Sequence, residues 1–163
     1  MAKKRIALSI AIGLCIISSI TMIVCLSIKS KDYTVADFTP PSFDNTAKNG
    51  IPKLNNENWI ELCENGMSFS AHILGELTLK DNSADVFFTN DKDNDVWLKL
   101  RILNGFGNVI AESGLIKPNQ YIETIAFSSK PKDGDRITLK IMAYEPSTYY
   151  SKGSVEIETT IIG

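Results

Sequence analysis

VWLKLRIL, residues 96–103, is the stretch of sequence that decides the fold. Its side chains fall into two alternating sets, Val96, Leu98, Leu100 and Ile102 on one parity and Trp97, Lys99, Arg101 and Leu103 on the other. A period of two places successive side chains on opposite faces of a β-strand. The first set is wholly apolar and the second is mostly polar, so we expect a strand with one buried and one solvated face.

The same alternation recurs along the chain. It is strong at residues 136–144 and 154–162, where Ile137, Leu139, Val155 and Ile157 fall on the inward parity. Weaker candidates are residues 70–79, interrupted by Gly75, and residues 84–89, 108–111 and 121–127. The apolar residues of the last candidate change parity, which predicts a β-bulge there.

Turn-forming sequences separate these candidates: KDNS at 80–83, NGFGN at 104–108 and KDGD at 132–135. Asn, Asp, Gly and Ser accept the backbone angles that tight turns require. Seven short strands joined in this way are typical of an immunoglobulin-like Greek key sandwich. We therefore expect residues 58–163 to form an all-β domain of about seven strands.

Before this domain lies a long uncharged run. Residues 6–28 (IALSIAIGLCIISSITMIVCLSI) contain no charged side chain, and as a helix they would rise about 34 Å, enough to cross the hydrocarbon core of a bilayer. A cleaved signal peptide is the alternative, but its apolar region is about 7 to 15 residues long and ends at a small-x-small site. The matches to such a site, at residues 25–27 and 34–36, are poor. We expect an uncleaved transmembrane helix.

The flanking charges predict its orientation. Lys3, Lys4 and Arg5 precede the run, whereas Lys29, Lys31 and Asp32 follow it. Because basic residues concentrate on the cytoplasmic side, residues 1–5 are expected to be a cytoplasmic tail. The protein would then be a single-pass membrane protein with its C-terminal domain outside.

Residues 29–57 lack an apolar period of either kind and contain Pro40, Pro41, Gly50 and Pro52. Such a composition predicts a flexible linker, which could hold the domain several nanometres from the membrane if extended. Residues 59–62 (WIEL) are apolar enough to dock on the domain.

Charge and cysteine content argue against a nucleic-acid-binding protein and against a small disulfide-bonded domain. Beyond residue 5 the chain carries 14 basic and 19 acidic residues, which removes the electrostatic basis for nucleic-acid binding. Cys63 is the single cysteine after the predicted helix, so the exported part cannot form an intramolecular disulfide.

Two stretches, VWLKLRILNGFGNVIAESGLIKP at 96–118 and AYEPSTYYSKGSVEIETTI at 143–161, add a family resemblance. They resemble small single-pass surface proteins of Gram-positive bacteria, a loosely defined set. In that pattern a Gly follows the Pro, whereas this chain has Asn119, which also tolerates positive φ. The resemblance implies an immunoglobulin-like surface module of undetermined activity and brings no catalytic residue.

Candidate metal ligands are few. Asp91, Asp93 and Asp95 have the first spacings of a calcium loop, but Val96 stands where the loop requires Gly and Ile102 where it requires a bidentate acid. We expect an acidic, solvated loop. His72 is the single histidine and is expected to be a partly buried strand residue. The sequence predicts no metal site and no cofactor.

Candidate nucleophiles are equally poor. Cys63 lies beside Glu64, whose charge opposes thiolate formation. Ser129–Lys132 matches S-x-x-K, but Pro131 prevents the helical turn on which that chemistry depends. Since no other motif indicates catalysis, we expect the protein not to be an enzyme.

The aromatic residues are the remaining functional signal. Trp97 and Tyr144 fall on the solvent-facing parity of their strands, and Tyr149 and Tyr150 lie in the polar turn EPSTYYSKG at 145–153. We predict that these four side chains bind a partner. The alternatives are packing of Trp97 beneath the linker and closure of the sandwich end by one of the two tyrosines.

The sequence therefore predicts a membrane-anchored, extracytoplasmic interaction module, an accessory of a surface, conjugative or secretory assembly whose partners are other surface or membrane proteins. Two other functions remain open: an inhibitor of extracytoplasmic hydrolases, and a carbohydrate-binding domain that uses the aromatic side chains.

Overall fold

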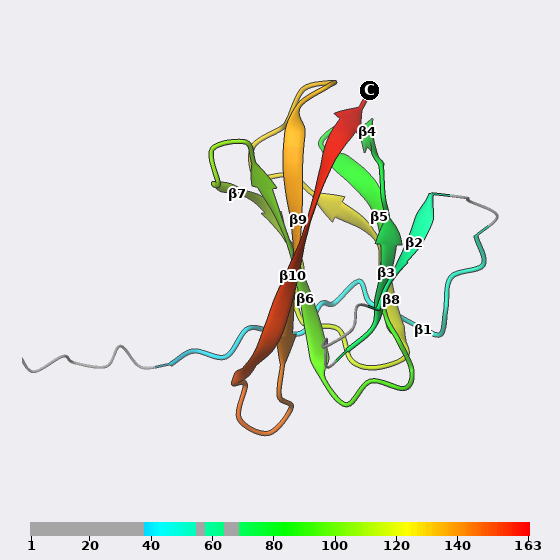
Figure 1. Ribbon diagram of the computed structural model, residues 1–163, viewed down its shortest axis with the longest axis vertical. Coiled ribbons are helices and arrows are strands. Elements are labelled where there is room, and N and C mark those ends of the chain that lie inside the picture. Colours follow the sequence, from blue (N-terminus) through cyan, green and yellow to red (C-terminus); the bar gives the residue numbers. More distant parts are fainter. Residues whose placement is uncertain (1–37, 55–57, 64–68) are drawn as a thin grey trace, which may run out of the picture. The chain divides into compact units, whose positions relative to one another are not determined.

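The computed structural model describes residues 38–54, 58–63 and 69–163. This part of the chain is all-β, and residues 40–163 form one compact unit (Figure 1). The expected cytoplasmic tail, the expected helix at 6–28 and residues 29–37 of the expected linker lie outside the described residues. Within those ranges, no helix has the length and hydrophobicity needed to cross a bilayer.

The described residues contain ten strands. They are β1 (Lys48–Asn49), β2 (Trp59–Leu62), β3 (Ala71–Leu74), β4 (Leu77–Lys80), β5 (Ser83–Asn90), β6 (Trp97–Asn104), β7 (Val109–Glu112), β8 (Gln120–Ala126), β9 (Arg136–Tyr144) and β10 (Ser151–Ile162). Each of the seven expected strands has a counterpart. Residues 70–79 divide into β3 and β4 because the chain bends at Gly75 and Glu76, where the Gly75 amide donates to the carbonyl of Asn58 at 2.7 Å.

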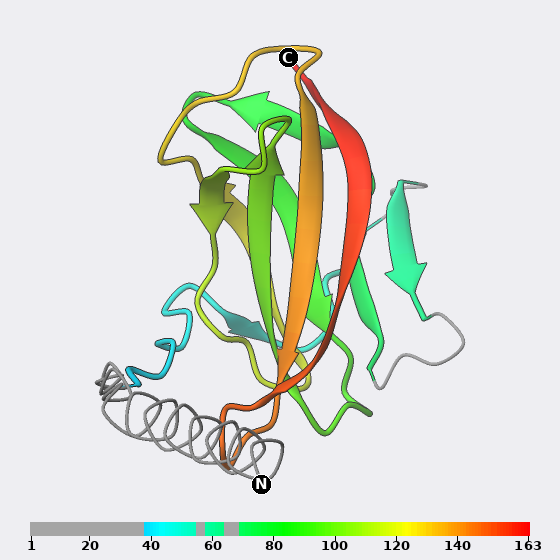
Figure 2. The same cartoon turned by 60° about the vertical axis from the view of Figure 1, so that its left-hand side comes forward.

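The strands form a curled, mixed sheet in the order β1-β8-β5-β4-β10-β9-β6-β7, and β3 pairs with both β2 and β5. Figures 1 and 2 show β6, β9 and β10 running side by side, with β5 and β8 behind them. All neighbours are antiparallel except β4 and β10. These two join in parallel through Ile161 opposite Leu77 and Ile162 opposite Thr78.

The core lies between the two layers of this curled sheet. Leu98, Leu100 and Ile102 of β6 are fully buried, as the alternation predicts. They pack in one cluster with side chains such as Phe88 of β5 and Ile122 of β8. Full burial of a side chain of this size contributes about 1.5 to 3 kcal/mol, so this cluster dominates the stability of the domain.

The predicted bulge lies between β5 and β8. Asp85 pairs with Thr124 and Phe88 pairs with Ile122, so that β5 has one residue more than β8 in between. The extra residue is on β5, where Phe87 has a φ of 41°. The parity change on β8 therefore indicated the right place, although the additional residue belongs to its neighbour.

Residues 40–50, expected to be linker, instead lie on the β-domain. Phe43 forms a parallel bridge with Leu115, and Lys48 and Asn49 pair with Tyr121 and Gln120 of β8. A single bridge and a two-residue strand need no run of alternating apolar residues, so the sequence of this segment did not predict a strand. Residues 59–62 dock as expected, by pairing with β3.

Candidate functional site: the outer face of β6 and β9

The outer face of β6 and β9 carries the side chains that alternate with the core. The register places Trp97 opposite Tyr144 and Lys99 opposite Met142. Trp97 and Tyr144 are half-buried, whereas Lys99 and Met142 are buried. An outer sheet face is normally polar, so an aromatic pair and a buried methionine are unusual for it.

An aromatic cluster forms at the start of β6. The Trp97 ring lies 4.7 Å from the ring of Phe43 and 5.2 Å from that of Tyr149, both in edge-to-face geometry. The Lys117 ammonium lies 4.7 Å from the centroid of the Phe43 ring. Such contacts are each worth about 0.5 to 1.5 kcal/mol beyond the area that they bury. We call Phe43, Trp97 and Tyr149 the aromatic cluster.

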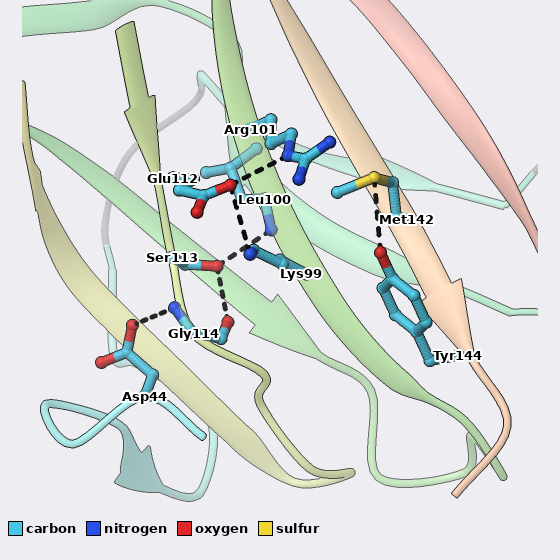
Figure 3. Close-up of polar contacts among 9 residues, drawn as sticks. All are labelled: Asp44, Lys99, Leu100, Arg101, Glu112, Ser113, Gly114, Met142 and Tyr144. Atoms are coloured by element: carbon cyan, nitrogen blue, oxygen red, sulfur yellow. Dashed lines mark hydrogen bonds and ion pairs between the residues drawn. The ribbon is translucent and has the colours of Figure 1, made fainter. Parts of the chain in front are cut away.

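Next to the cluster, charged side chains hold the outer face together (Figure 3). The Glu112 carboxylate accepts from Arg101 Nε at 2.9 Å and lies 3.2 Å from Lys99 Nζ. The Lys99 side chain is only 9% exposed, so this ion pair satisfies a charge that would otherwise be buried alone. Tyr144 Oη lies 3.7 Å from the sulfur of Met142 and donates a weak hydrogen bond to it.

Burial and the two neighbouring cations shift the pKa of Glu112 in opposite directions. Desolvation raises it, but hydrogen bonds from Arg101 and Lys99 lower it, and the net result is a lowered pKa. A carboxyl whose pKa is depressed by folding stabilises the fold above its unfolded pKa and loses that contribution as the pH falls through the folded value. Since 45% of the Glu112 side chain is exposed, solvent screens much of this effect.

Asp44 and Gly114 place Phe43 on Trp97. The Gly114 amide donates to Asp44 Oδ2 at 2.9 Å (Figure 3). The Asp44 amide in turn donates to the carbonyl of Leu115 at the same distance. A Cβ at position 114 would lie 2.6 Å from Asp44 Cα and 2.7 Å from the carbonyl carbon of Phe43. Only glycine allows this approach of the two backbones.

The turn between β9 and β10 places Tyr149 against the cluster. Its amide donates to the carbonyl of Glu145 at 2.8 Å, and the Glu145 amide donates to the carbonyl of Tyr150 at 2.9 Å. Tyr149 has a φ of 59°, a left-handed conformation that costs a residue with a Cβ about 1 to 2 kcal/mol. The contact of its ring with Trp97 offsets part of this strain.

Tyr149→Gly is therefore expected to destabilise the protein less than Tyr149→Ala does, by roughly 1 kcal/mol, because glycine adopts the left-handed region without strain. Both variants lose the ring contact equally. Thermal melts of the full-length protein in detergent would measure the difference. The usual order, with glycine less stable than alanine, would show that the left-handed turn does not persist once the ring is removed.

Of the four predicted binding residues, the structure brings Trp97, Tyr144 and Tyr149 together, while Tyr150 is 73% exposed at the adjoining turn. The contact of Phe43 with Trp97 agrees with the alternative in which Trp97 packs beneath the predicted linker. Sequence reasoning missed Phe43, because it was assigned to a linker. An aromatic residue in an otherwise polar segment is the signal that could have indicated it.

The other candidate residues of the sequence lie elsewhere. Asp91 Oδ1 accepts from the amide of Asp93 at 3.0 Å, as in a turn. In the described ranges, no group of three His, Cys, Asp or Glu side chains is placed to hold a metal ion. His72 is stacked on Trp59 with 4.4 Å between the ring centroids, and its Nε2 lies 3.9 Å from Glu61. Cys63 is exposed, and Ser129–Lys132 lies in a loop.

The outer face of β6 and β9 thus carries an aromatic cluster in which Trp97 and Tyr149 are half-buried and Phe43 is exposed, next to an ion-paired polar row. The exposed Tyr150 follows Tyr149 in the chain. Such an arrangement can bind a surface through its rings. No family model matches this sequence, and no curated protein or solved structure compared with it matches either.

Proposed function

We propose that this protein is a single-pass membrane protein whose extracytoplasmic domain binds another surface or membrane protein through the aromatic cluster and Tyr150, without catalysis of its own. The observation that carries the proposal is the contact between the rings of Trp97 and Tyr149, next to which in the chain stands Tyr150, whose side chain is 73% exposed. Interface centres are enriched in tyrosine and tryptophan, because large rigid rings bury area at little entropic cost.

The uncharged run at residues 6–28 and the basic residues before it support the membrane location. The order of the strands supports an immunoglobulin-like Greek key as the domain type, because the connection from β5 to β6 crosses between the two layers. The parallel pairing of β4 with β10 is an addition to this otherwise antiparallel arrangement. With the resemblance to Gram-positive surface proteins, this favours an accessory of a surface, conjugative or secretory assembly.

Tyr150→Ala is expected to reduce partner recovery about tenfold while leaving the melting temperature unchanged, because the ring is 73% exposed. The measurement is chemical cross-linking of tagged full-length protein in its own cells, followed by purification from carbonate-washed membranes and quantitative mass spectrometry. Phe106→Ala is the matched control, because Phe106 is 91% exposed in the turn between β6 and β7. It should leave recovery intact.

Two results would count against the proposal in different ways. Equal recovery with the Tyr150→Ala variant and the unchanged protein would place the interface elsewhere on the domain. Release of the full-length chain by the carbonate wash would instead exclude the membrane anchor and leave the aromatic interface to be tested on the soluble protein.

A further inference from the structure

β10 is long, and one of its two edges is almost entirely open. It pairs with β9 from Ser151 to Thr160, but on its other edge it pairs with β4 through Ile161 and Ile162 alone. Figures 1 and 2 show β10 meeting β4 only at its C-terminal end. Within the described residues, no strand pairs with the remainder of that edge, although near its C-terminal end the Thr159 hydroxyl donates to the carbonyl of Gly75, between β3 and β4.

The backbone groups that face the open edge follow from the hydrogen bonding at its end. The Ile161 amide donates to the carbonyl of Asp135 at 3.0 Å, so residue 161 points its backbone groups toward the β9 side. Backbone groups of a strand alternate in direction from one residue to the next. Residues 154, 156 and 158 therefore direct their N–H and C=O groups to the open edge, and residue 160, which has the same parity, borders the pairing with β4.

This edge lacks the features that usually prevent strand pairing. Proteins protect edges with proline, lysine, bulges or inward-pointing charges. Residues 154–160 (SVEIETT) contain no proline or lysine, and their inward residues Val155, Ile157 and Thr159 are uncharged. The irregularity of β10 lies between Ser151 and Gly153, before this stretch. The open template is about 20 Å long at 3.3 Å per residue.

The side chains beside the open edge determine which strand fits. Glu156 and Glu158 point to the solvent side. Both also line an open hollow of about 520 Å³, which lies on the β9 side of β10, over residues of β6 and β9. Across the closed edge, Lys140 Nζ of β9 bonds Glu156 Oε1 at 2.6 Å. Opposite charges on facing strands stabilise their pairing. The pair on β9 and β10 therefore shows that a basic side chain on a neighbouring strand suits these carboxylates.

We propose that residues 154–160 bind an extended segment of a partner protein by β-strand addition, with Lys or Arg of the partner at the positions facing Glu156 and Glu158. Main-chain hydrogen bonds supply the affinity and alternate side chains the specificity. A second copy of this chain fits less well. Full antiparallel overlap of residues 154–160 with themselves would set each Glu156 opposite a Glu158, and like charges directly opposite destabilise a sheet. This interaction is independent of the membrane anchor and of the aromatic cluster.

The test uses labelled, end-blocked seven-residue peptides and the full-length protein in detergent. The probe alternates Lys and Val, one control alternates Glu and Val, and a second control is the Lys–Val peptide N-methylated on alternate residues of its bonding edge. Fluorescence anisotropy is expected to show the Lys–Val peptide binding at least about tenfold more tightly than either control. Equal binding of the three peptides, or no binding of the Lys–Val peptide, would overturn the proposal.

Variants of β10 locate the interaction. Glu158→Pro removes one N–H that faces the open edge and none that faces β9, so it should abolish peptide binding while the melt is retained. The matched variant Glu158→Gln should keep the backbone pairing and reduce the preference for Lys over Glu. Unchanged binding by Glu158→Pro with an intact melt would overturn the assignment. If that variant fails to fold, the N-methylated peptide decides. A concentration-dependent dimer that the Lys–Val peptide cannot dissociate would assign the edge to a second copy instead.

Discussion

Asn90→Ala is expected to lower the free energy of unfolding by about 3 kcal/mol, since burial of unpaired polar groups costs about 1 to 3 kcal/mol for each group. Asn90 is fully buried. Its Nδ2 donates to the carbonyls of Val96 and Ile116 at 2.9 and 3.0 Å, and its Oδ1 accepts from Asn94 at 2.6 Å. One side chain therefore connects the end of β5 to two other segments, and alanine would leave their polar groups without this partner.

For a domain of this size the loss corresponds to a fall of about 10 °C in melting temperature. Tryptophan fluorescence of the full-length protein in detergent would follow it. Asn49→Ala is the matched control, because Asn49 is exposed and accepts one hydrogen bond, from Gln120 at 3.2 Å; a change within about 0.5 kcal/mol is expected. Similar melting of the two variants would show that the network around Asn90 contributes no more than a surface hydrogen bond.

Gly114→Ala is expected to detach residues 42–49 from the rest of the β-domain and to destabilise the protein by about 3 kcal/mol, at the upper end of the usual cost of overpacking. The added methyl group would meet the backbone of Phe43 and Asp44, which cannot turn aside as a flexible side chain could. Detachment also removes the Phe43 ring from Trp97. The aromatic cluster would then lose one of its three rings although no aromatic residue is substituted.

Trypsin cleavage after Lys48 reports this detachment, because Lys48 is held in β1 by pairing with Tyr121 and by an ion pair with Glu123 at 2.6 Å. We expect cleavage to accelerate by about tenfold or more, which corresponds to a local opening made at least 1.4 kcal/mol easier. Gly105→Ala is the control, since its Cβ would meet only a carbonyl oxygen at 3.8 Å. An unchanged cleavage rate in Gly114→Ala would show that the segment tolerates the methyl group in place.

The strands were predictable from the sequence because their period is local. Leu98, Leu100 and Ile102 are buried as their alternation indicates, and Asn119 has the positive φ, 59°, that its place after Pro118 suggests. Pairing partners are not local. Nothing in the sequence of β10 shows that two of its residues meet β4 in parallel, and a two-residue strand such as β1 has no period to detect.

The candidate site was predictable to a similar degree. Parity placed Trp97 and Tyr144 on the outer face, where the structure has them. The contact between Trp97 and Tyr149 depends on the left-handed turn at residue 149, and the contact between Trp97 and Phe43 depends on the hydrogen bonds of Asp44. Both contacts arise from backbone conformation and long-range pairing, and the alternation of side chains along a strand gives no information about either.

The attachment of residues 42–49 has a mechanical consequence. A pulling force applied through the chain before Pro40 reaches the hydrogen bonds of Ser42 and Asp44 with Leu115 before it reaches the strands of the core. These few bonds are loaded first, and the pairing of β1 with β8 is loaded next. Once both are broken, about eight residues are released, or about 25 Å of extended chain. The core strands stay folded while this segment extends. Residues 42–49 can therefore extend and re-attach reversibly when a force acts on the N-terminal side of the domain.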